Sequence, residues 1–324
     1  MKAVTAAANA KTKPKKEKTP KRKITWREIK KQKGLIFLTI PFIVYAFIFN
    51  YLPLGGWMMA FQNYKPKNGL FGSEFVGMKH FITMFSKEVF PVVVRNTFCM
   101  GLINLVTGTV TAIVLAILLN EVRNMYAKKV VQTISYLPHF LSWVIVAGIV
   151  RDVLSPETGV INTMLVNLHI LEAPINWLAY PKYFWGIVAL SNIWKEVGWG
   201  SIIYLSAITA INPDLYEAAS IDGAGRIRKI MHVTLPELKP TISILLLINL
   251  GNVLNNSFET QYLLRNDLLV KFSDTIDIYA LEYGISQGNF SVGTAAGIFK
   301  SVVSIALIAI GNIVTKRLGE ETLY

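Results

Sequence analysis

Six long apolar segments constrain the fold of this 324-residue chain more than any other feature. Each has the roughly 20 residues that an α-helix needs to cross the hydrocarbon core of a bilayer. They cover residues 34–54, 96–120, 129–150, 183–208, 241–264 and 293–315. Such runs are too long for the strands of a membrane barrel, and backbone groups in lipid must bond within their own segment. The sequence therefore predicts an all-α, polytopic bundle of six transmembrane helices.

The composition agrees with a membrane protein. The chain is 52% hydrophobic and only 16% charged, whereas soluble domains carry about 25% charged residues. Its single cysteine, Cys99, cannot form an internal disulfide. The four histidines (His80, His139, His169 and His232) are far apart and lack the spacing of metal ligands. We therefore expect no metal or other cofactor to be bound by this chain.

The first 33 residues form a strongly basic tail. They hold 13 of the 33 Lys and Arg residues and only two acidic ones, and they have no apolar periodicity. No aromatic stacking surface or recognition module accompanies this charge, so nucleic acid is not the expected partner. A basic stretch before the first span instead keeps the N-terminus in the cytoplasm. Residues 24–33 are expected to form a short helix at the lipid surface, and residues 34–324 form the transmembrane domain.

The number of spans and the positive charges together predict the topology. Six spans place both termini on the same side of the membrane, and the basic tail marks that side as cytoplasmic. Outside the tail, each side carries nine Lys and Arg residues, but the inner loops are shorter and therefore more densely charged. The loop at 209–240, between the fourth and fifth spans, is then cytoplasmic.

This loop, "INPDLYEAASIDGAGRIRKIMHVTLP", reads as two helical pieces joined by a glycine turn. Asn212 can cap the first piece, and Pro213 suits its first position. Gly223 can end it in a left-handed conformation, and the second piece starts at Arg226. The small side chains around Ala218 would let another protein approach the backbone closely. The residues alone leave two alternatives: a docking element, or an ordinary well-capped cytoplasmic hairpin.

The spacing within the loop resembles a known family. Glu217-Ala218-Ala219, then Gly223, then Val233-Thr234-Leu235-Pro236 resembles the EAA loop of permease subunits in binding-protein-dependent ABC importers. Val233 departs slightly from it, because the family often has Ile there. The segments 137–150, 154–165 and 293–324 resemble the carbohydrate branch of that family. Within that branch, the chain is similar to permease subunits of alginate-oligosaccharide importers.

The resemblance implies a type I ABC importer permease in the bacterial inner membrane, with the loop at 209–240 as a coupling helix. The implied contacts with an ATP-hydrolysing subunit are Glu217, Ala218, Ala219, Asp222, Gly223, Leu235 and Pro236. It also implies a second permease subunit, expected to be a different chain, two ATPase subunits that bind ATP and Mg, and an extracytoplasmic solute-binding protein. The chain lacks a G-x-x-x-x-G-K-[ST] phosphate loop, so we do not expect it to hydrolyse ATP itself.

Polar residues within the spans need a reason, because they are costly in lipid. On a continuous fifth helix, Asn249, Asn252, Asn255, Asn256 and Glu259 would share an arc of about 120°. The predicted substrate pathway comprises Asn192, Lys195, Trp199, Asn249, Asn252, Asn256, Glu259 and Lys300. Amides suit sugar hydroxyls, indole suits a sugar ring, and the lysines suit the carboxylates of acidic sugars. The alternative is that these residues join helices to each other, for example through a Lys195–Glu259 pair.

The resemblance thus implies a permease subunit of an ATP-driven importer of oligosaccharides, with acidic, alginate-like sugars among the candidates, that works by alternating access. One alternative is import of another sugar or a neutral oligosaccharide. The other is a polytopic glycosyltransferase, whose nearest carboxylates would be Asp267, Asp274 and Asp277. We expect those three to form a solvated outer face instead. No paired carboxylates or Ser/His/Asp set occur on a credible scaffold, so the chain is predicted not to be an enzyme.

Overall fold

The computed structural model describes residues 30–255 and 258–317, which are mostly helical. Contacts divide the chain into two units, Met1–Gly55 and Gly56–Tyr324. Most of the basic tail, the pathway residue Asn256 and the last seven residues lie outside the described part of the chain.

The first unit is an exposed apolar helix. α2 (Lys33–Ala46) is followed by a π-helical turn, η1 (Phe47–Tyr51), and then by the 3-10 helix η2 (Leu52–Phe61) that leads into the second unit. None of the residues of α2 or η1 is buried within the structure. A helix that is apolar on all sides and exposed is suited to lipid, as the sequence predicted for residues 34–54.

The second unit contains the remaining helices and a two-stranded antiparallel hairpin of β1 (Gln62–Asn63) and β2 (Glu74–Phe75). Its first half comprises α3 (Gly69–Gly72), α4 (Lys79–Ser86), α5 (Val89–Glu121), α6 (Met125–Tyr136), η3 (Leu137–Phe140), α7 (Trp143–Val153), α8 (Val160–Asn167) and η4 (Trp177–Ala179). Its second half comprises α9 (Pro181–Thr209), α10 (Pro213–Ile221), α11 (Arg226–Lys229), η5 (Ile230–Thr234), α12 (Leu235–Asn252), α13 (Phe258–Leu264), α14 (Val270–Ser273), α15 (Ile276–Tyr279), η6 (Ala280–Ser286) and α16 (Phe290–Arg317).

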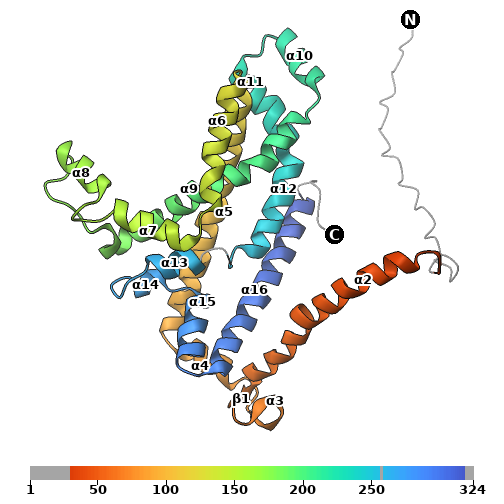
Figure 1. The fold of residues 1–324 in the computed structure, drawn as a ribbon, viewed down its shortest axis with the longest axis vertical. Coiled ribbons are helices and arrows are strands. Elements are labelled where there is room, and N and C mark those ends of the chain that lie inside the picture. The colour runs from red at the N-terminus through yellow and green to blue at the C-terminus, as the bar shows by residue number, and fades with distance from the viewer. Residues whose placement is uncertain (1–29, 256–257, 318–324) are drawn as a thin grey trace, which may run out of the picture. The chain divides into compact units, whose positions relative to one another are not determined.

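The two long helices α5 and α9 form the centre of this unit, where they pack against each other (Figure 1). One apolar cluster joins them near the C-terminal ends of both helices, where α12 also packs. Its buried members are Ala112, Ala116, Leu119, Tyr204, Leu205, Ile208 and Leu238. A second cluster joins the N-terminal halves of both helices to α7, α13 and the residue before α14, through Met100, Ala147, Phe184, Val188, Leu264 and Leu269. The helix pair is therefore clamped by apolar contacts on both sides of its middle.

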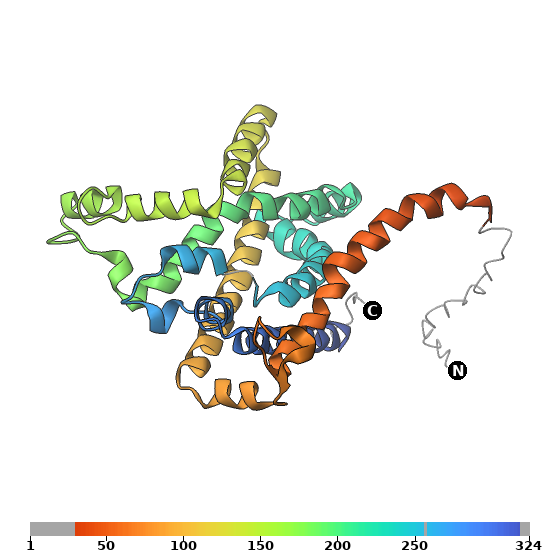
Figure 2. The same ribbon diagram turned by 60° about the horizontal axis from the view of Figure 1, so that its bottom comes forward.

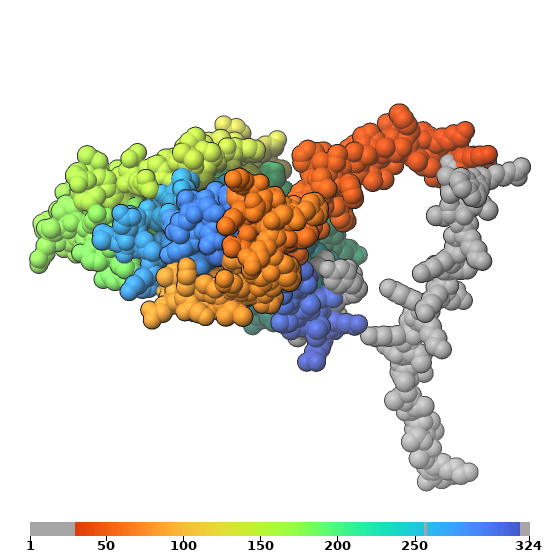
Figure 3. Space-filling view, turned by 90° about the horizontal axis from the view of Figure 1, so that it is seen from below, coloured from red at the N-terminus to blue at the C-terminus, as the bar shows by residue number. Residues whose placement is uncertain are grey.

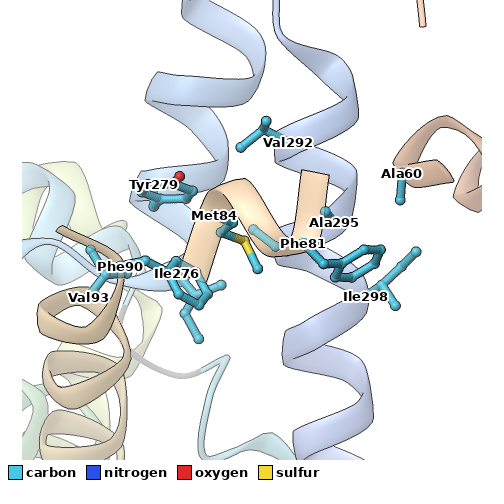
Figure 4. Close-up of a cluster of buried hydrophobic side chains, with 11 residues drawn as sticks. Ala60, Phe81, Met84, Phe90, Val93, Ile276, Tyr279, Val292, Ala295 and Ile298 are labelled. Atoms are coloured by element: carbon cyan, nitrogen blue, oxygen red, sulfur yellow. The ribbon is translucent and has the colours of Figure 1, made fainter. Parts of the chain in front are cut away.

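A third apolar cluster joins α4, the start of α5, α15 and α16. Figure 4 shows Phe81 and Met84 of α4 among side chains from the other three elements. Phe90 and Tyr279 make an edge-to-face contact, with their ring centroids 5.4 Å apart. In Figure 3 the orange α4 segment lies against the blue C-terminal segment. This cluster ties the end of the unit that contains the hairpin to the last helix.

The described helices only partly match the predicted spans. Four are long and apolar enough to cross a membrane: Lys33–Phe61, Val89–Glu121, Arg226–Asn252 and Phe290–Arg317. The segment predicted as 129–150 is instead bent by 104° between Phe140 and Trp143, and that pair would make a fifth span. α9 has the length of a span but carries Lys195 and Glu196 in its middle.

The predicted fifth span at 241–264 is interrupted. α12 ends at Asn252, and a separate short helix, α13, starts at Phe258. The expectation that Asn249 and Glu259 lie on one continuous helical arc is therefore wrong. Irregular backbone at membrane depth is tolerated where protein surrounds it or where it lines a water-filled cavity, and Figure 2 shows α13 in blue beside the central helices.

The loop at 209–240 has the predicted caps and turn. The Asn212 side chain accepts a hydrogen bond from the Asp214 N–H at 3.1 Å, and Pro213 is the first residue of α10. Gly223 has a φ of +73°, a backbone conformation in which a residue with a side chain would be strained. Figure 1 shows α10 at one end of the second unit and α4 with the hairpin at the opposite end.

Close approach of α6 to α9 depends on Gly198. A Cβ atom at this position would overlap the carbonyl oxygen of Ser135 at the end of α6. At Gly186, on the same helix, a Cβ atom would meet no other atom within 4 Å. These two glycines form a matched pair for testing the contact.

We expect Gly198→Ala to lower the thermal stability of the purified protein, because overpacking of this kind costs about 1–3 kcal/mol. Gly186→Ala should be neutral or slightly stabilising, because alanine favours a helix more than glycine does. Thermal unfolding in detergent measures both variants. Equal stability of the two would show that α6 and α9 do not meet closely at Gly198.

Candidate functional site

The middle of the α5–α9 pair borders a cavity of about 650 Å³. α12, α13 and the start of α7 complete its wall. The cavity lies between the two apolar clusters that clamp the helix pair. Its volume is within the range of about 300–1,000 Å³ typical of small-molecule sites.

The wall of the cavity combines amides, hydroxyls, aromatic rings and two carboxylates. The polar and aromatic lining residues are Asn104, Thr107, Thr109, Trp143, Asn192, Glu196, Trp199, Tyr204, Asn249, Asn255, Phe258, Glu259 and Thr260. Among the described residues that line it there is no lysine or arginine. Amides both donate and accept hydrogen bonds and aromatic rings offer flat apolar faces, so this wall suits a ligand that has both hydroxyls and apolar ring faces.

Asn192 joins three elements at the cavity. Its Nδ2 donates to the Val188 carbonyl at 2.9 Å, within α9, and approaches Asn104 Oδ1 of α5 at 3.3 Å. The Thr260 hydroxyl of α13 lies 3.5 Å from Asn192 Oδ1. This last contact is at the limit of a hydrogen bond, and Asn192 lines the cavity.

A charged network lies beside the cavity, at the bend between α6 and α7. Lys195 is only 5% exposed, and its Nζ donates to the His139 carbonyl at 2.7 Å. The same Nζ lies 3.1 Å from Glu196 Oε1, and 5.3 Å from the centre of the Trp143 ring. The Lys195 charge is thus used within the protein, and it pairs with Glu196 rather than with Glu259.

The structure brings together only some of the predicted pathway residues. Asn192, Trp199, Asn249 and Glu259 line the cavity. Lys195 lies behind the wall, and Asn252 is exposed at the end of α12, where its Nδ2 donates to the Ile248 carbonyl. Lys300 is on α16, outside the lining, and Asn256 is not described.

Sequence reasoning missed the contribution of α5 and of the bend. Asn104, Thr107 and Thr109 lie on α5, and Trp143 follows the bend. Polar residues in the apolar segment 96–120 were the available signal for α5. No sequence signal indicated Trp143, because this residue reaches the cavity wall only as a result of the 104° bend.

Lys300 has a partner within the protein. Its Nζ lies 2.5 and 2.6 Å from the two carboxylate oxygens of Asp277 on α15. The Lys300 side chain is 13% exposed and that of Asp277 is 29% exposed. The pair therefore ties α16 to α15, which accounts for a lysine in an otherwise apolar helix.

Two of the three carboxylates expected to form a solvated outer face, Asp274 and Asp277, are instead engaged, whereas Asp267 is exposed. Asp274 is 4% exposed, and its Oδ1 lies 3.2 Å from the Arg265 guanidinium. Arg265 also pairs with Glu282. Burial raises the pKa of the Asp274 carboxyl above its ordinary value, although the Arg265 charge opposes this. Asp274 pairs with Arg265 and Asp277 pairs with Lys300, so the expectation of a solvated acidic face is wrong for both.

The predicted coupling residues lie together on the exposed loop. Glu217, Ala218, Asp222, Gly223 and Pro236 are exposed. Ala219 and Leu235 are partly buried. Ile221 is 88% exposed and Ile227 is 77% exposed. An exposed surface of this kind, with apolar side chains around small ones, is typical of an interaction site.

Two side-chain contacts fasten α10 to the helix that follows it. The Tyr216 hydroxyl lies 2.9 Å from that of Thr234, and Lys229 Nζ donates to the Ser220 hydroxyl at 2.6 Å. The following helical run, Arg226–Asn252, continues to Asn249 in the cavity wall. This helical run therefore begins in the exposed loop and ends at the cavity wall.

The chain has clear relatives. The family described as the binding-protein-dependent transport system inner membrane component matches residues 108–320. The chain belongs to this family. It is therefore a multi-pass membrane transport component and not an enzyme. The match includes most of the cavity wall and the whole loop at 209–240.

Individual relatives cover nearly the whole chain. The polygalacturonan/rhamnogalacturonan transport system permease protein YteP of Bacillus subtilis (strain 168) is 42% identical, with 95% of each chain covered. Protein LplB of the same organism is 40% identical, with 93% of this chain and 94% of LplB covered.

Solved structures are also similar. A chain in the crystal structure of a bacterial ABC transporter involved in the import of the acidic polysaccharide alginate is 40% identical, with a TM-score of 0.83. The similarity covers 90% of this chain and 98% of that one. A second structure is that of a bacterial alginate ABC transporter in complex with an alginate pentasaccharide-bound periplasmic protein. A chain in it is 39% identical, with a TM-score of 0.84, and the similarity covers 92% of this chain and 99% of that one.

No group of three or more His, Cys, Asp or Glu residues in the described part of the chain is arranged to hold a metal ion. The pathway hypothesis assigned both Lys195 and Lys300 to the substrate, whereas both are paired within the protein. The pair between Lys300 and Asp277 joins two different helices and is the one to test.

We expect Lys300→Met to lower stability by roughly 1–3 kcal/mol, because it leaves the Asp277 carboxylate without its partner. The double variant Lys300→Met/Asp277→Asn should regain most of this loss, since neither charge remains. Thermal unfolding in detergent measures both. If Lys300→Met unfolds like the unmodified protein yet transports less, Lys300 serves the pathway and not the helix contact.

Proposed function

We propose that this chain is the permease subunit of an ATP-driven importer that moves oligosaccharides across the bacterial inner membrane by alternating access. The single observation that carries the proposal is the polar and aromatic cavity in the middle of the α5–α9 pair, in a chain of this family. Its amides and rings are the groups that sugars need. The apolar clusters on either side give the cavity a rigid frame.

The coupling to ATP hydrolysis would act through the loop at 209–240. Glu217, Ala218, Asp222 and Gly223 present the exposed surface to an ATPase subunit, and ATP with Mg is bound by that partner. Closure of two ATPase subunits would displace α10, and the contacts at Tyr216 pass this displacement to the run Arg226–Asn252. In physical terms, ATP binding favours one of two arrangements through differential contacts.

The remaining partners and the topology follow from the same assignment. We infer that residues 34–324 form the permease domain and that both termini and the loop at 209–240 face the cytoplasm. A second permease subunit, expected to be a different chain, completes the pathway. An extracytoplasmic solute-binding protein delivers the sugar, which agrees with the periplasmic protein named in the alginate transporter complex.

Acidic oligosaccharides are the first candidate for the substrate. The relatives named above include a permease for polygalacturonan and rhamnogalacturonan and a transporter for alginate. Both similarities extend over at least 90% of this chain. We propose that this chain contacts the hydroxyls and ring faces of such a sugar, and that the second permease subunit supplies the charges that balance its carboxylates.

Neutral oligosaccharides are the second candidate, and the chemistry of the wall favours them. The described lining residues include Glu196 and Glu259 but no lysine or arginine. Lys195 and Lys300, the cations that an acidic sugar would need, are both paired within the protein. Carboxylate side chains accept hydrogen bonds from sugar hydroxyls but repel a uronate.

Uptake by the reconstituted importer separates the two candidates. We expect vesicles that contain both permeases, the ATPases and the receptor to import an alginate pentasaccharide and to exclude maltopentaose. Asn192→Leu or Asn249→Leu should slow this uptake about tenfold or more, because a lost polar contact in a sugar site leaves buried groups unpaired. Asn167→Leu, at the exposed end of α8, is the control. Import of maltopentaose alone would favour the neutral candidate.

A matched pair of substitutions tests the loop. Gly223→Val should abolish most of the receptor-stimulated ATP hydrolysis, because a β-branched residue does not tolerate a φ of +73°. Gly225→Val should retain it, since Gly225 has an extended backbone with φ −70° and ψ 172°. ATP hydrolysis in vesicles measures both. Normal stimulation of the Gly223→Val complex would remove the loop from the coupling mechanism.

A further inference from the structure

The bend between α6 and α7 places one histidine directly behind the cavity wall. His139 lies in η3, three residues before the Ser142 cap of α7. It is not among the described residues that line the cavity. Its side chain is 28% exposed, and α9 supplies three side chains that contact this residue.

Two polar contacts fix this histidine. Its Nδ1 lies 2.7 Å from Glu196 Oε2, and because a carboxylate only accepts, the ring nitrogen donates. Its backbone carbonyl accepts from Lys195 Nζ at 2.7 Å. Lys195 also pairs with Glu196, so backbone and ring of His139 are held by two residues that contact each other.

One face of the imidazole ring lies against Trp199, a residue of the cavity wall. The His139 and Trp199 rings are stacked, with their centroids 4.5 Å apart and their planes within 3° of parallel. Trp199 is 48% exposed and lines the cavity. Phe140 adds an edge contact to the same indole, at 6.2 Å. One face of the indole is therefore covered by the imidazole, and Trp199 still lines the cavity.

We propose that His139 is a positioning residue for sugar recognition. Held by Glu196 and Lys195, it backs the Trp199 indole and keeps the opposite face of that ring turned to the cavity as a stacking surface for a pyranose ring. This inference rests on the proposed function, because it assigns Trp199 to the sugar. It adds that the orientation of the stacking surface is set at a helix bend, through a residue that does not touch the sugar.

A purely structural role for His139 would have different consequences. If His139 only stabilises the bend, its hydrogen bond to Glu196 and its contact with Lys195 account for its whole contribution to uptake. A side chain without a ring would then serve equally well, provided that it donates the same hydrogen bond. If the residue positions Trp199, the flat ring matters and the hydrogen bond alone does not suffice.

Two substitutions separate these roles. His139→Phe keeps a flat ring against Trp199 but removes the N–H that Glu196 accepts. His139→Asn keeps an N–H donor near the same place but removes the ring. His139→Gln serves as a second ring-free variant if the asparagine variant does not assemble. His169→Asn, at an exposed position after α8, is the control.

The first measurement needs no substrate. The emission of Trp199 is taken as the difference between each complex and the same complex carrying Trp199→Phe, with acrylamide as the quencher. We expect His139→Asn to make Trp199 more accessible to acrylamide and to shift its emission to longer wavelength, because one indole face loses its cover. His139→Phe and His169→Asn should leave both quantities unchanged.

The second measurement is uptake of an alginate pentasaccharide or maltopentaose, whichever the unmodified complex imports, at saturating receptor. His139→Asn should lower the rate about three- to tenfold, as expected from losing the effect of one aromatic contact. His139→Phe should stay within about twofold of the unmodified rate. In a Trp199→Ala background His139→Asn should have no further effect, because it acts through that ring.

Unchanged Trp199 emission in both ring-free variants would overturn the proposal. So would equal loss of uptake in His139→Phe and His139→Asn, or additive losses in the Trp199→Ala background. If the unmodified complex imports neither sugar, the proposed function fails instead. The emission measurement then still decides whether His139 sets the position of Trp199.

Discussion

The pairing of α5 with α9 is the contact on which the second unit depends. Both helices are apolar toward each other near their ends and polar in between. Apolar contacts at both ends hold the helices at a fixed separation, so the polar middle does not collapse and remains as a cavity. The same two helices thus supply both the stability of the unit and the wall of its candidate site.

The interrupted segments show how a membrane helix can end without leaving polar backbone unsatisfied. At the bend after α6, the buried Lys195 ammonium binds the His139 carbonyl, a group that a helix end leaves without a partner. Near the start of α5, Asn96 Nδ2 binds the Lys271 and Asp274 carbonyls in a similar way. Long-range side-chain contacts therefore replace the hydrogen bonds that a continuous helix would have made.

Local features were predictable from the sequence, and long-range ones were not. The Asn212 cap, Pro213 and the Gly223 turn depend on neighbouring residues only, so their pattern indicated the structure directly. The breaks at 141–142 and after Asn252 lie inside apolar stretches whose composition reads as one span. Lys195 binds the His139 carbonyl of η3, and Lys300 pairs with Asp277 of α15. Because these partners lie on other elements, the sequence did not reveal them, and both lysines were assigned to the pathway although neither lines the cavity.

The helical run from Arg226 to Asn252 has a mechanical consequence, because it contains the π-helical turn η5 and Pro240. At about 1.5 Å per residue, this run reaches from the exposed loop to the cavity wall. A π-helical turn and an internal proline are the places where a helix bends. Motion imposed on α10 therefore reaches Asn249 through these two points, and they, together with the contacts at Tyr216, set how tightly ATP hydrolysis is coupled to sugar movement.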